Sequence, residues 1–222
     1  GPYAHVITAT THKTLRGPRG GLILCTEEFK DAVNKGCPLV IGGPLPHILA
    51  AKAVAMTEAN TPEYREYAKR IIENAKGLAD SLMNRGIDLI TSGTDNHLML
   101  IDVRPFGLNG RQAESAMREC GITLNRNSIP YDPNGPWYTS GLRVGTPAVT
   151  TLGMGGTEMD EIADILSAVI SHTRSLSRNG KKSSKYVLDD GIREQARGRV
   201  QKLLDRFPVY PGIDLDFLRS AV

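Results

Sequence analysis

One short basic stretch constrains this chain more than any other, because it surrounds a single lysine with hydroxyl, imidazole and guanidinium groups. It runs from Thr8 to Gly21 with the sequence TATTHKTLRGPRGG, and its lysine is Lys13. Neighbouring positive charge lowers the pKa of a lysine, and an uncharged amine can condense with an aldehyde to give a Schiff base. Proteins commonly hold pyridoxal phosphate in this way. The stretch therefore predicts a cofactor lysine, although composition alone favours a solvated basic loop that ends in a turn.

Apolar segments bracket the basic stretch and favour a structured loop. The segments YAHVIT (3–8) and GLILCT (21–26) are typical of short strands. Glycines at positions 17, 20 and 21 allow a tight turn and a close approach of the backbone to a bound group. We therefore expect Lys13 to lie on a loop between two strands.

The motif TTHKTLRGPRGG resembles the cofactor-lysine motif of serine hydroxymethyltransferase, a pyridoxal-phosphate enzyme. Further matching stretches follow in the same order: IGGPLPH (41–47), GTDNHL (93–98), NRNSIP (125–130) and TSGLRVGTPAVT (139–150). The resemblance covers most of residues 3 to 150. It implies an α/β fold of the fold-type I, aspartate aminotransferase-like class of PLP-dependent transferases. It also implies interconversion of serine plus tetrahydrofolate with glycine plus 5,10-methylenetetrahydrofolate.

The same resemblance implies roles for residues of the basic stretch. Lys13 would carry pyridoxal 5'-phosphate, and Thr10 would donate a hydrogen bond close to the reacting nitrogen. His12 would lie beside the cofactor, and Arg19 would help to keep Lys13 uncharged. We expect these four residues to form the catalytic group.

Two successive glycines, Gly42 and Gly43, can present backbone N–H groups to an anion with no side chain in the way. A simple turn is the alternative, and the residues alone favour it. The resemblance implies that the pair contacts the cofactor phosphate of a neighbouring subunit, and hence a homodimer with shared sites. The chain departs from the family just before this pair, where Leu39, Val40 and Ile41 replace small residues and a glutamine.

Arg143 lies between apolar residues in the stretch SGLRVG, so we expect it to be buried or half-buried. A buried arginine needs an anionic partner, and its planar fork matches a carboxylate. An internal Asp or Glu is the default partner. The resemblance implies instead that Arg143 binds the α-carboxylate of the amino-acid substrate.

The stretch 125–141 is long and rich in Pro, Asn and Gly, which is typical of a functional or mobile loop. Its tryptophan could stack on a flat ligand or fill a gap in the core. The resemblance favours a folate ligand, contacted by Asn127, Gly135, Pro136 and Trp137.

Periodicity predicts the remaining organisation. Pro62, after an N-cap at Thr61, begins a long amphipathic helix that Gly86 ends, and we place a domain boundary near residue 60. Residues 1–59 would end the PLP-binding large domain, and residues 60–222 would form a small α+β domain with helices on one face of a short sheet. The expected helices are 27–34, 46–59, 109–120, 157–176 and 189–207, and a capping box of Thr157 and Asp160 would begin the fourth. The expected strands are 87–91, 97–103 and one that starts at residue 122. We expect residues 35–47 to be irregular and residues 177–185 to form a charged linker.

Composition excludes several classes of protein. The net charge of +3, from 27 basic and 24 acidic residues, is too small to indicate a nucleic-acid partner. The three cysteines lack metal-ligand spacing, so we expect no metal site and a reducing compartment, the cytoplasm. No apolar run reaches the length of a membrane span.

Some parts of such a cofactor site have no counterpart in the sequence. A pyridoxal enzyme of this type needs a carboxylate at the pyridine nitrogen, a stacked ring and a main phosphate-binding loop, and in the family these precede the lysine. We therefore expect this chain to be the C-terminal half of such an enzyme, poorly active without the N-terminal half. Another fold-type I enzyme, such as a threonine aldolase, and a non-catalytic small-domain fragment are the alternatives.

Overall fold

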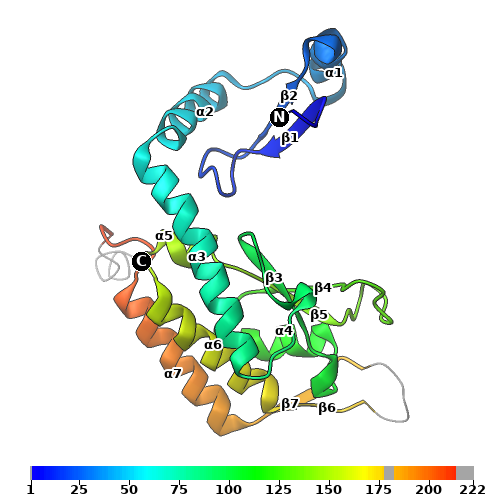
Figure 1. The fold of residues 1–222 in the computed structure, drawn as a ribbon, viewed down its shortest axis with the longest axis vertical. Helices are drawn as coiled ribbons and strands as arrows, with labels where there is room; N and C mark the ends of the chain where they lie inside the picture. Colours follow the sequence, from blue (N-terminus) through cyan, green and yellow to red (C-terminus); the bar gives the residue numbers. More distant parts are fainter. Residues whose placement is uncertain (1, 178–182, 214–222) are drawn as a thin grey trace, which may run out of the picture. The chain divides into compact units, whose positions relative to one another are not determined.

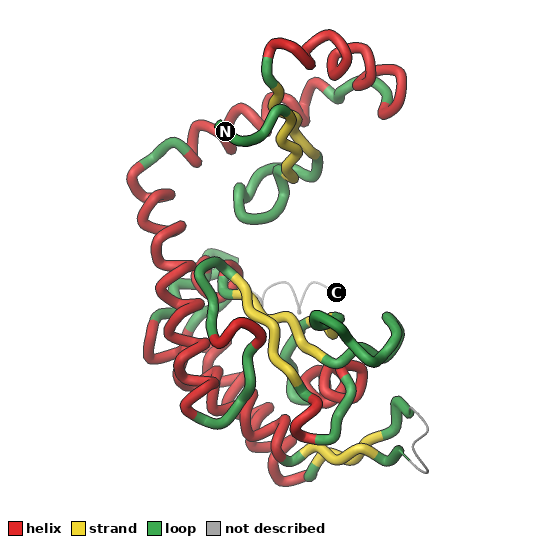
Figure 2. The backbone as a smooth tube through the Cα atoms, turned by 45° about the vertical axis from the view of Figure 1, so that its right-hand side comes forward, coloured by secondary structure: helices red, strands yellow, loops and turns green. Residues whose placement is uncertain are grey.

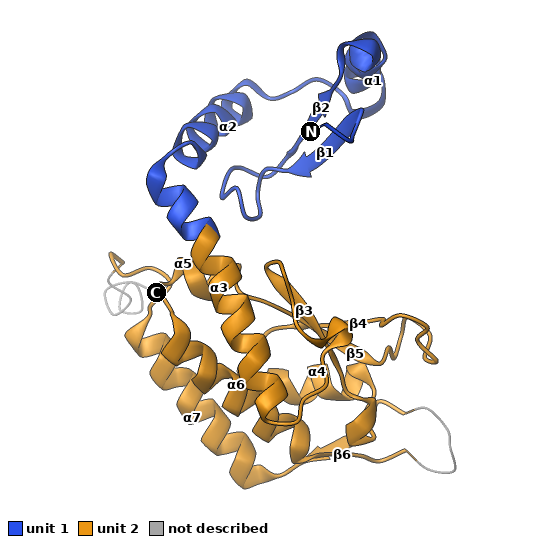
Figure 3. Ribbon diagram, in the orientation of Figure 1, with its two compact units in different colours: residues 1–68 blue, residues 69–222 orange. Residues whose placement is uncertain are grey.

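The chain forms two compact units, and the division between them falls within one long helix, α3 (Pro62–Asn84). A computed structural model describes residues 2–177 and 183–213 (Figure 1). The first unit is Gly1–Ala68 and the second is Lys69–Val222 (Figure 3). The division lies a few residues beyond the boundary expected near residue 60.

The first unit begins with an antiparallel hairpin. Strand β1 (Val6–Thr10) pairs with β2 (Gly21–Cys25), with Val6 opposite Cys25 and Thr10 opposite Gly21. The first strand starts three residues later than expected, and the second matches the expectation closely. The hairpin places the stretch 11–20, with Lys13, on the loop that joins the two strands.

Helix α1 (Lys30–Ile41) follows a short 3-10 helix, η1 (Glu27–Phe29). The prediction of a helix at 27–34 with an irregular segment after it was therefore wrong at its C-terminal end, because α1 continues through Pro38. A proline inside a helix removes one backbone hydrogen bond but does not by itself end the helix. The helix ends at Gly42, which adopts a φ of +78° that favours glycine.

The next two helices confirm the prediction from periodicity. Helix α2 (Pro46–Ala59) has the expected bounds. In α3 the Thr61 hydroxyl accepts a hydrogen bond from the Tyr64 N–H at 3.2 Å, which is the expected N-cap. After the helix, Gly86 has a φ of +75°. The buried side chains of α3 are Ile71, Asn74, Ala75, Leu78, Ala79 and Leu82.

The second unit is built on a three-stranded antiparallel sheet with the order β3–β5–β4. The strands are β3 (Leu98–Asp102), β4 (Asn125–Asn127) and β5 (Gly141–Gly145). Met99, Ile101 and Leu142 lie on one face and are buried. Helices cover that face, as Figure 2 shows, so the expected α+β arrangement is confirmed for this unit.

Four helices accompany the sheet. Helix α4 (Gly110–Glu119) starts with a capping box, in which Asn109 and Gln112 exchange hydrogen bonds of 3.0 and 3.1 Å. The long helices α6 (Gly156–Ser171) and α7 (Asp190–Arg206) lie side by side (Figure 1). The core combines their apolar faces with the buried stripe of α3. The described part of this unit also contains the short helix α5 (Pro147–Thr151) and the 3-10 helices η2 (Ile90–Ser92) and η3 (Arg104–Phe106).

Two expected strands differ in the structure. Only Leu89 of the predicted strand 87–91 pairs, in an isolated bridge with Ile101. The chain turns away there because Thr91 and Ser92 have positive φ values of 68° and 53°. The strand predicted from residue 122 starts only at Asn125, since the Ile122 N–H still bonds to the end of α4 at Met117.

The capping box predicted for Thr157 and Asp160 was wrong. Helix α6 starts one residue earlier, and the Glu158 carboxylate accepts a hydrogen bond of 2.9 Å from the Gly155 N–H. The helix also ends five residues before the expected end near 176, because β6 (Thr173–Ser175) pairs with β7 (Tyr186–Leu188). Residues 178–182 of the expected linker lie outside the described residues. Helix α7 confirms the helix expected at 189–207.

Among the described residues, no helix combines the length and the apolar character needed to cross a membrane.

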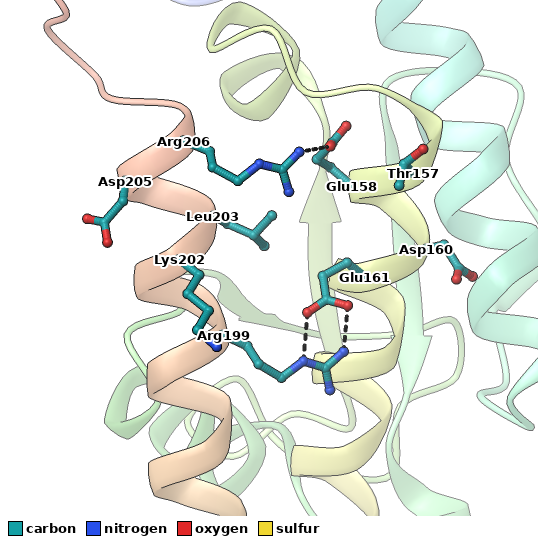
Figure 4. A pocket seen from close by; sticks show the side chains of 9 residues that line it. All are labelled: Thr157, Glu158, Asp160, Glu161, Arg199, Lys202, Leu203, Asp205 and Arg206. Carbon is teal, nitrogen blue, oxygen red and sulfur yellow. Dashed lines mark hydrogen bonds and ion pairs between the residues drawn. The ribbon is translucent and has the colours of Figure 1, made fainter.

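A network of ion pairs connects α6 and α7 and extends to Arg85, just after α3. Arg199 donates two hydrogen bonds of 2.6 and 2.7 Å to Glu161 (Figure 4). It donates a third, of 2.7 Å, to Asp164. Arg85 pairs with Asp160 at 2.9 Å and with Asp164 at 3.2 Å. Hydrogen bonds from Arg199 lower the pKa of Glu161 and of Asp164, and a hydrogen bond from Arg85 lowers the pKa of Asp160.

These lowered pKa values predict an acid-labile second unit. Carboxylates with depressed pKa values in the folded state stabilise it above their unfolded pKa, about 4, and that stabilisation disappears as the pH falls through the folded values. We expect the free energy of unfolding, measured by urea titration with circular dichroism, to fall between about pH 5 and pH 2. Arg199→Gln should reduce this pH dependence. Arg197→Gln is the matched control on the same helix, since among the described residues Arg197 forms an ion pair only with Glu194, at 4.0 Å. An unchanged pH profile in Arg199→Gln would contradict the assignment.

Candidate functional site

Backbone hydrogen bonds fix the loop that carries Lys13. The Thr11 N–H donates to the Gly20 carbonyl at 3.0 Å, and the Gly17 N–H donates to the Thr11 carbonyl at 2.8 Å. The Thr11 side chain is fully buried, and its hydroxyl donates to the Pro18 carbonyl at 2.7 Å. The loop is therefore an ordered extension of the hairpin rather than a solvated turn.

Helix α2 packs so closely on this loop that two positions accept only glycine without a local shift. A Cβ atom at Gly17 would lie 2.9 Å from the Thr11 carbonyl oxygen and 3.0 Å from the Ala55 Cβ. A Cβ at Gly20 would lie 3.0 Å from the Lys52 side chain. The Lys52 ammonium also donates to the Gly21 carbonyl at 2.7 Å. Gly17 is thus required by the close approach of the loop backbone to itself and to α2, whereas a side chain at Gly20 would meet the flexible end of Lys52.

The first two turns of α3 contact the loop from another direction. The Tyr64 hydroxyl donates to the Thr14 carbonyl, one residue after Lys13, at 2.9 Å. Arg16 lies over the ring of Tyr67, with its guanidinium carbon 4.4 Å from the ring centroid. Burial and the neighbouring Tyr67 raise the pKa of the Tyr64 hydroxyl, which keeps it protonated as a hydrogen-bond donor. These contacts hold the backbone on the C-terminal side of Lys13.

The four residues predicted to form the catalytic group share this one loop. Lys13, Thr10 and Arg19 are exposed, and His12 is half-buried with its Nδ1 atom 3.2 Å from the Gly20 carbonyl oxygen. Within residues 2–177 and 183–213, no hydrogen bond or ion pair engages the Lys13 amine. The loop can therefore offer an unpaired primary amine to an incoming carbonyl compound.

Gly42 and Gly43 form an exposed link between α1 and α2. Neither backbone N–H has a hydrogen-bond partner in the described part of the chain. Both donors are therefore available to an anion. Just before the pair, Leu39, Val40 and Ile41 lie at the exposed end of α1, at 73%, 82% and 74% exposure, although all three are apolar.

The prediction that Arg143 is buried or half-buried was wrong. Arg143 is exposed, and no carboxylate among the described residues forms an ion pair with it. The reason is strand alternation, because Leu142 points into the core and its neighbour Arg143 points to the opposite face. The partners opposite Arg143 in the sheet are Leu100 on β3 and Asn125 on β4. The open face of the sheet therefore presents an unpaired guanidinium.

The stretch between β4 and β5 covers the next row of this open face. Ile129 is buried against the sheet, and a Cβ at Gly141 would lie only 2.6 Å from its side chain. Asn127 lies opposite Gly141, on the same face as Arg143, and its side-chain amide donates to the Ser128 carbonyl at 2.7 Å. The loop thus lies on the same open face as Arg143.

Trp137, with Gly135 and Pro136, lies in the exposed part of this loop. Its ring is 60% exposed, so the alternative in which the tryptophan fills a core gap is wrong. The Arg111 guanidinium lies 4.1 Å from the ring centroid, and the buried Nη1 atom of Arg111 has no hydrogen-bond partner among the described residues. This arrangement offers a flat aromatic surface to a ligand.

The residues that support the lysine loop and the loop between β4 and β5 were not predicted from the sequence. Lys52 and Tyr64 support the lysine loop, and Arg111 supports Trp137. Lys52 and Tyr64 lie on helices whose spacing indicated only packing, and their partners are 31 and 50 residues away. No local signal identifies such contacts.

The groove between α6 and α7 is a poorer candidate site. It has a volume of about 530 Å³ and carries acidic and basic side chains on its walls (Figure 4). Arg199 and Arg206 are already paired with Glu161 and Glu158. The charges of this groove therefore stabilise the contact between the two helices.

Comparisons with known proteins agree with the sequence motifs. The family model described as serine hydroxymethyltransferase matches residues 1–166. A serine hydroxymethyltransferase of Salinispora tropica is 55% identical over 216 residues, which cover 96% of this chain and 45% of that protein. One of Treponema pallidum is 54% identical over 220 residues, 98% of this chain and 38% of that protein. One of Mycolicibacterium smegmatis is 52% identical over 214 residues, 96% of this chain and 43% of that protein. The chain thus spans less than half the length of these relatives, and it belongs to the serine hydroxymethyltransferase family.

Proposed function

We propose that this chain supplies the cofactor lysine, the carboxylate-binding arginine and the folate-binding loop of a serine hydroxymethyltransferase. The reaction is the interconversion of serine plus tetrahydrofolate with glycine plus 5,10-methylenetetrahydrofolate. The observation that carries the proposal is the unpaired amine of Lys13 on a loop that hydrogen bonds and two helices hold in place. Membership of the family supports the same reaction.

The residues of the first unit fit pyridoxal 5'-phosphate. Lys13 provides the amine for covalent attachment, and Gly42 and Gly43 provide unpaired N–H groups for a phosphate. Thr10 would donate a hydrogen bond near the Lys13 nitrogen, and His12 would lie beside the cofactor ring. When bound, pyridoxal phosphate withdraws electrons from the α-carbon of the amino acid. Arg19 adds positive charge close in sequence to Lys13.

The open sheet face of the second unit fits the amino-acid substrate. Arg143 binds the α-carboxylate through its planar fork, because no internal carboxylate among the described residues occupies it. The folate ring system binds along the neighbouring loop, stacked on Trp137 and contacted by Asn127, Gly135 and Pro136. The exposed indole supports this assignment.

The proposal extends to the assembly. Exposed apolar residues around the glycine pair, such as Leu39 and Val40, fit a surface that a second subunit covers in a homodimer with shared sites. Free thiols at Cys25, Cys37 and Cys120 fit the reducing cytoplasm. Residues 1–59 correspond to the end of the large domain and residues 60–222 to the small domain.

Reductive labelling tests the role of Lys13. After addition of pyridoxal phosphate and borohydride, peptide mass spectrometry should find the adduct on Lys13, because that amine is unpaired on an ordered loop. Lys13→Arg should abolish it. Lys35→Arg, at an exposed lysine of α1, is the matched control and should leave it unchanged. A label spread over many lysines would contradict the proposal.

The contact between Tyr64 and the loop gives a second test. Tyr64→Phe removes the hydrogen bond to the Thr14 carbonyl. We expect the rate of Lys13 labelling to fall about two- to tenfold, the range that corresponds to one hydrogen bond. Tyr3→Phe is the control, since Tyr3 is almost completely exposed in the same unit. Equal rates in the two variants would mean that Tyr64 does not position the lysine.

A third test concerns Arg143. Arg143→Lys keeps the charge but loses the planar fork, so the serine concentration at half-saturation should rise about tenfold. The measurement is a serine titration followed through the absorbance of the bound cofactor. Arg174→Lys, at an exposed position of β6, should behave like the unmodified chain. If both variants bind serine equally well, Arg143 does not bind the carboxylate.

A further inference from the structure

Asp132 holds together the loop between β4 and β5, and we infer that it is the positioning residue for folate binding there. This inference rests on the proposed folate-binding function of the loop. Asp132 lies outside the set of residues that the family resemblance assigns to the ligand. Its side chain faces inward, toward the two ends of its own loop.

The carboxylate of Asp132 accepts four hydrogen bonds. One oxygen, Oδ2, accepts from the Ile129 N–H at 3.1 Å and from the Ser140 N–H at 2.8 Å. The other, Oδ1, accepts from the Asn134 N–H at 2.8 Å and from the Ser140 hydroxyl at 2.6 Å. Ile129 and Ser140 lie at opposite ends of the loop. The side chain of Asp132 therefore connects the two ends of the loop, Ile129 and Ser140, through hydrogen bonds.

This closure fixes the part of the loop that carries Trp137. The Asn134 side-chain amide donates to the Ser140 hydroxyl at 2.9 Å, which adds a second connection across the loop. Between these residues the Tyr138 and Thr139 N–H groups both donate to the Gly135 carbonyl, at 3.1 and 3.0 Å. Trp137 lies inside that turn, so the closure constrains the backbone that carries its side chain.

The loop also contains backbone conformations that need such support. Tyr131 and Thr139 have positive φ values of 54° and 55°, which are unfavourable for residues other than glycine. Asp132 is adjacent to Tyr131, and its partner Ser140 is adjacent to Thr139. The hydrogen bonds of Asp132 thus act where the backbone is strained.

Only a carboxylate satisfies all four donors. Both oxygens of an ionised aspartate accept hydrogen bonds, whereas an asparagine would turn an N–H₂ group toward two of these donors. Burial acts to raise the pKa of Asp132, but the hydrogen bonds from Ser140, Asn134 and Ile129 outweigh it and lower the pKa. The aspartate therefore stays ionised at neutral pH.

Fluorescence of the chain's single tryptophan tests the inference directly. Tetrahydrofolate is titrated into the 222-residue chain, and quenching of Trp137 emission gives the dissociation constant. We expect Asp132→Asn to raise this constant at least about tenfold, because charge-assisted hydrogen bonds are lost. Acrylamide should also quench Trp137 more strongly in this variant. Ser140→Ala, which removes one donor, should shift both quantities in the same direction by less.

Asp88→Asn is the matched control, since Asp88 is exposed in the same unit and its side chain has no partner among the described residues. Circular dichroism on every variant separates local from global loss of structure. If the unmodified chain binds and Asp132→Asn binds equally well, the positioning role is wrong and the folate proposal stands. If the unmodified chain shows no saturable quenching, the folate proposal fails, and with it the role of Asp132 in ligand binding.

Discussion

Burial of one face of the three-stranded sheet decides where the polar groups of the second unit can lie. Met99, Ile101 and Leu142 pack into the core with the stripe of α3 and with α4 and α6. Strand alternation then directs Arg143, the neighbour of Leu142, to the opposite face. The core thus does more than stabilise the unit. It also leaves the guanidinium of Arg143 on the face that points away from the core.

The lysine loop of the first unit depends on a different constraint, the close approach of two backbones. Thr11 and Gly17 bond across the loop, and Ala55 on α2 leaves no room for a side chain at Gly17. Such contacts order a loop with little burial of apolar surface. An ordered loop loses less conformational entropy when it binds a ligand, which favours a reactive group held at its tip.

The sequence predicted those parts of the fold whose signals act over a few residues. The N-cap at Thr61 was identified correctly because the donor and acceptor lie within one turn. The expected burial of Arg143 was wrong because apolar neighbours alone do not reveal which face a strand residue occupies. The four hydrogen-bond donors to Asp132 belong to three residues of its own loop, yet only the fold shows that these donors converge on one carboxylate. The roles predicted for the neighbours of Lys13 came from the resemblance of the whole motif to that of a known family. Residue spacing alone would not have predicted these roles.

The two ends of the loop between β4 and β5 rest on glycines that leave no space for change. A Cβ at Gly110 would lie 2.2 Å from the Thr139 hydroxyl, and one at Gly141 would lie 2.6 Å from Ile129. The intervening residues 133–137 are largely exposed, although Trp137 contacts Arg111 and Asn134 is hydrogen-bonded to Ser140. The fixed ends therefore keep a substitution at an exposed position in the middle of the loop from spreading into the core.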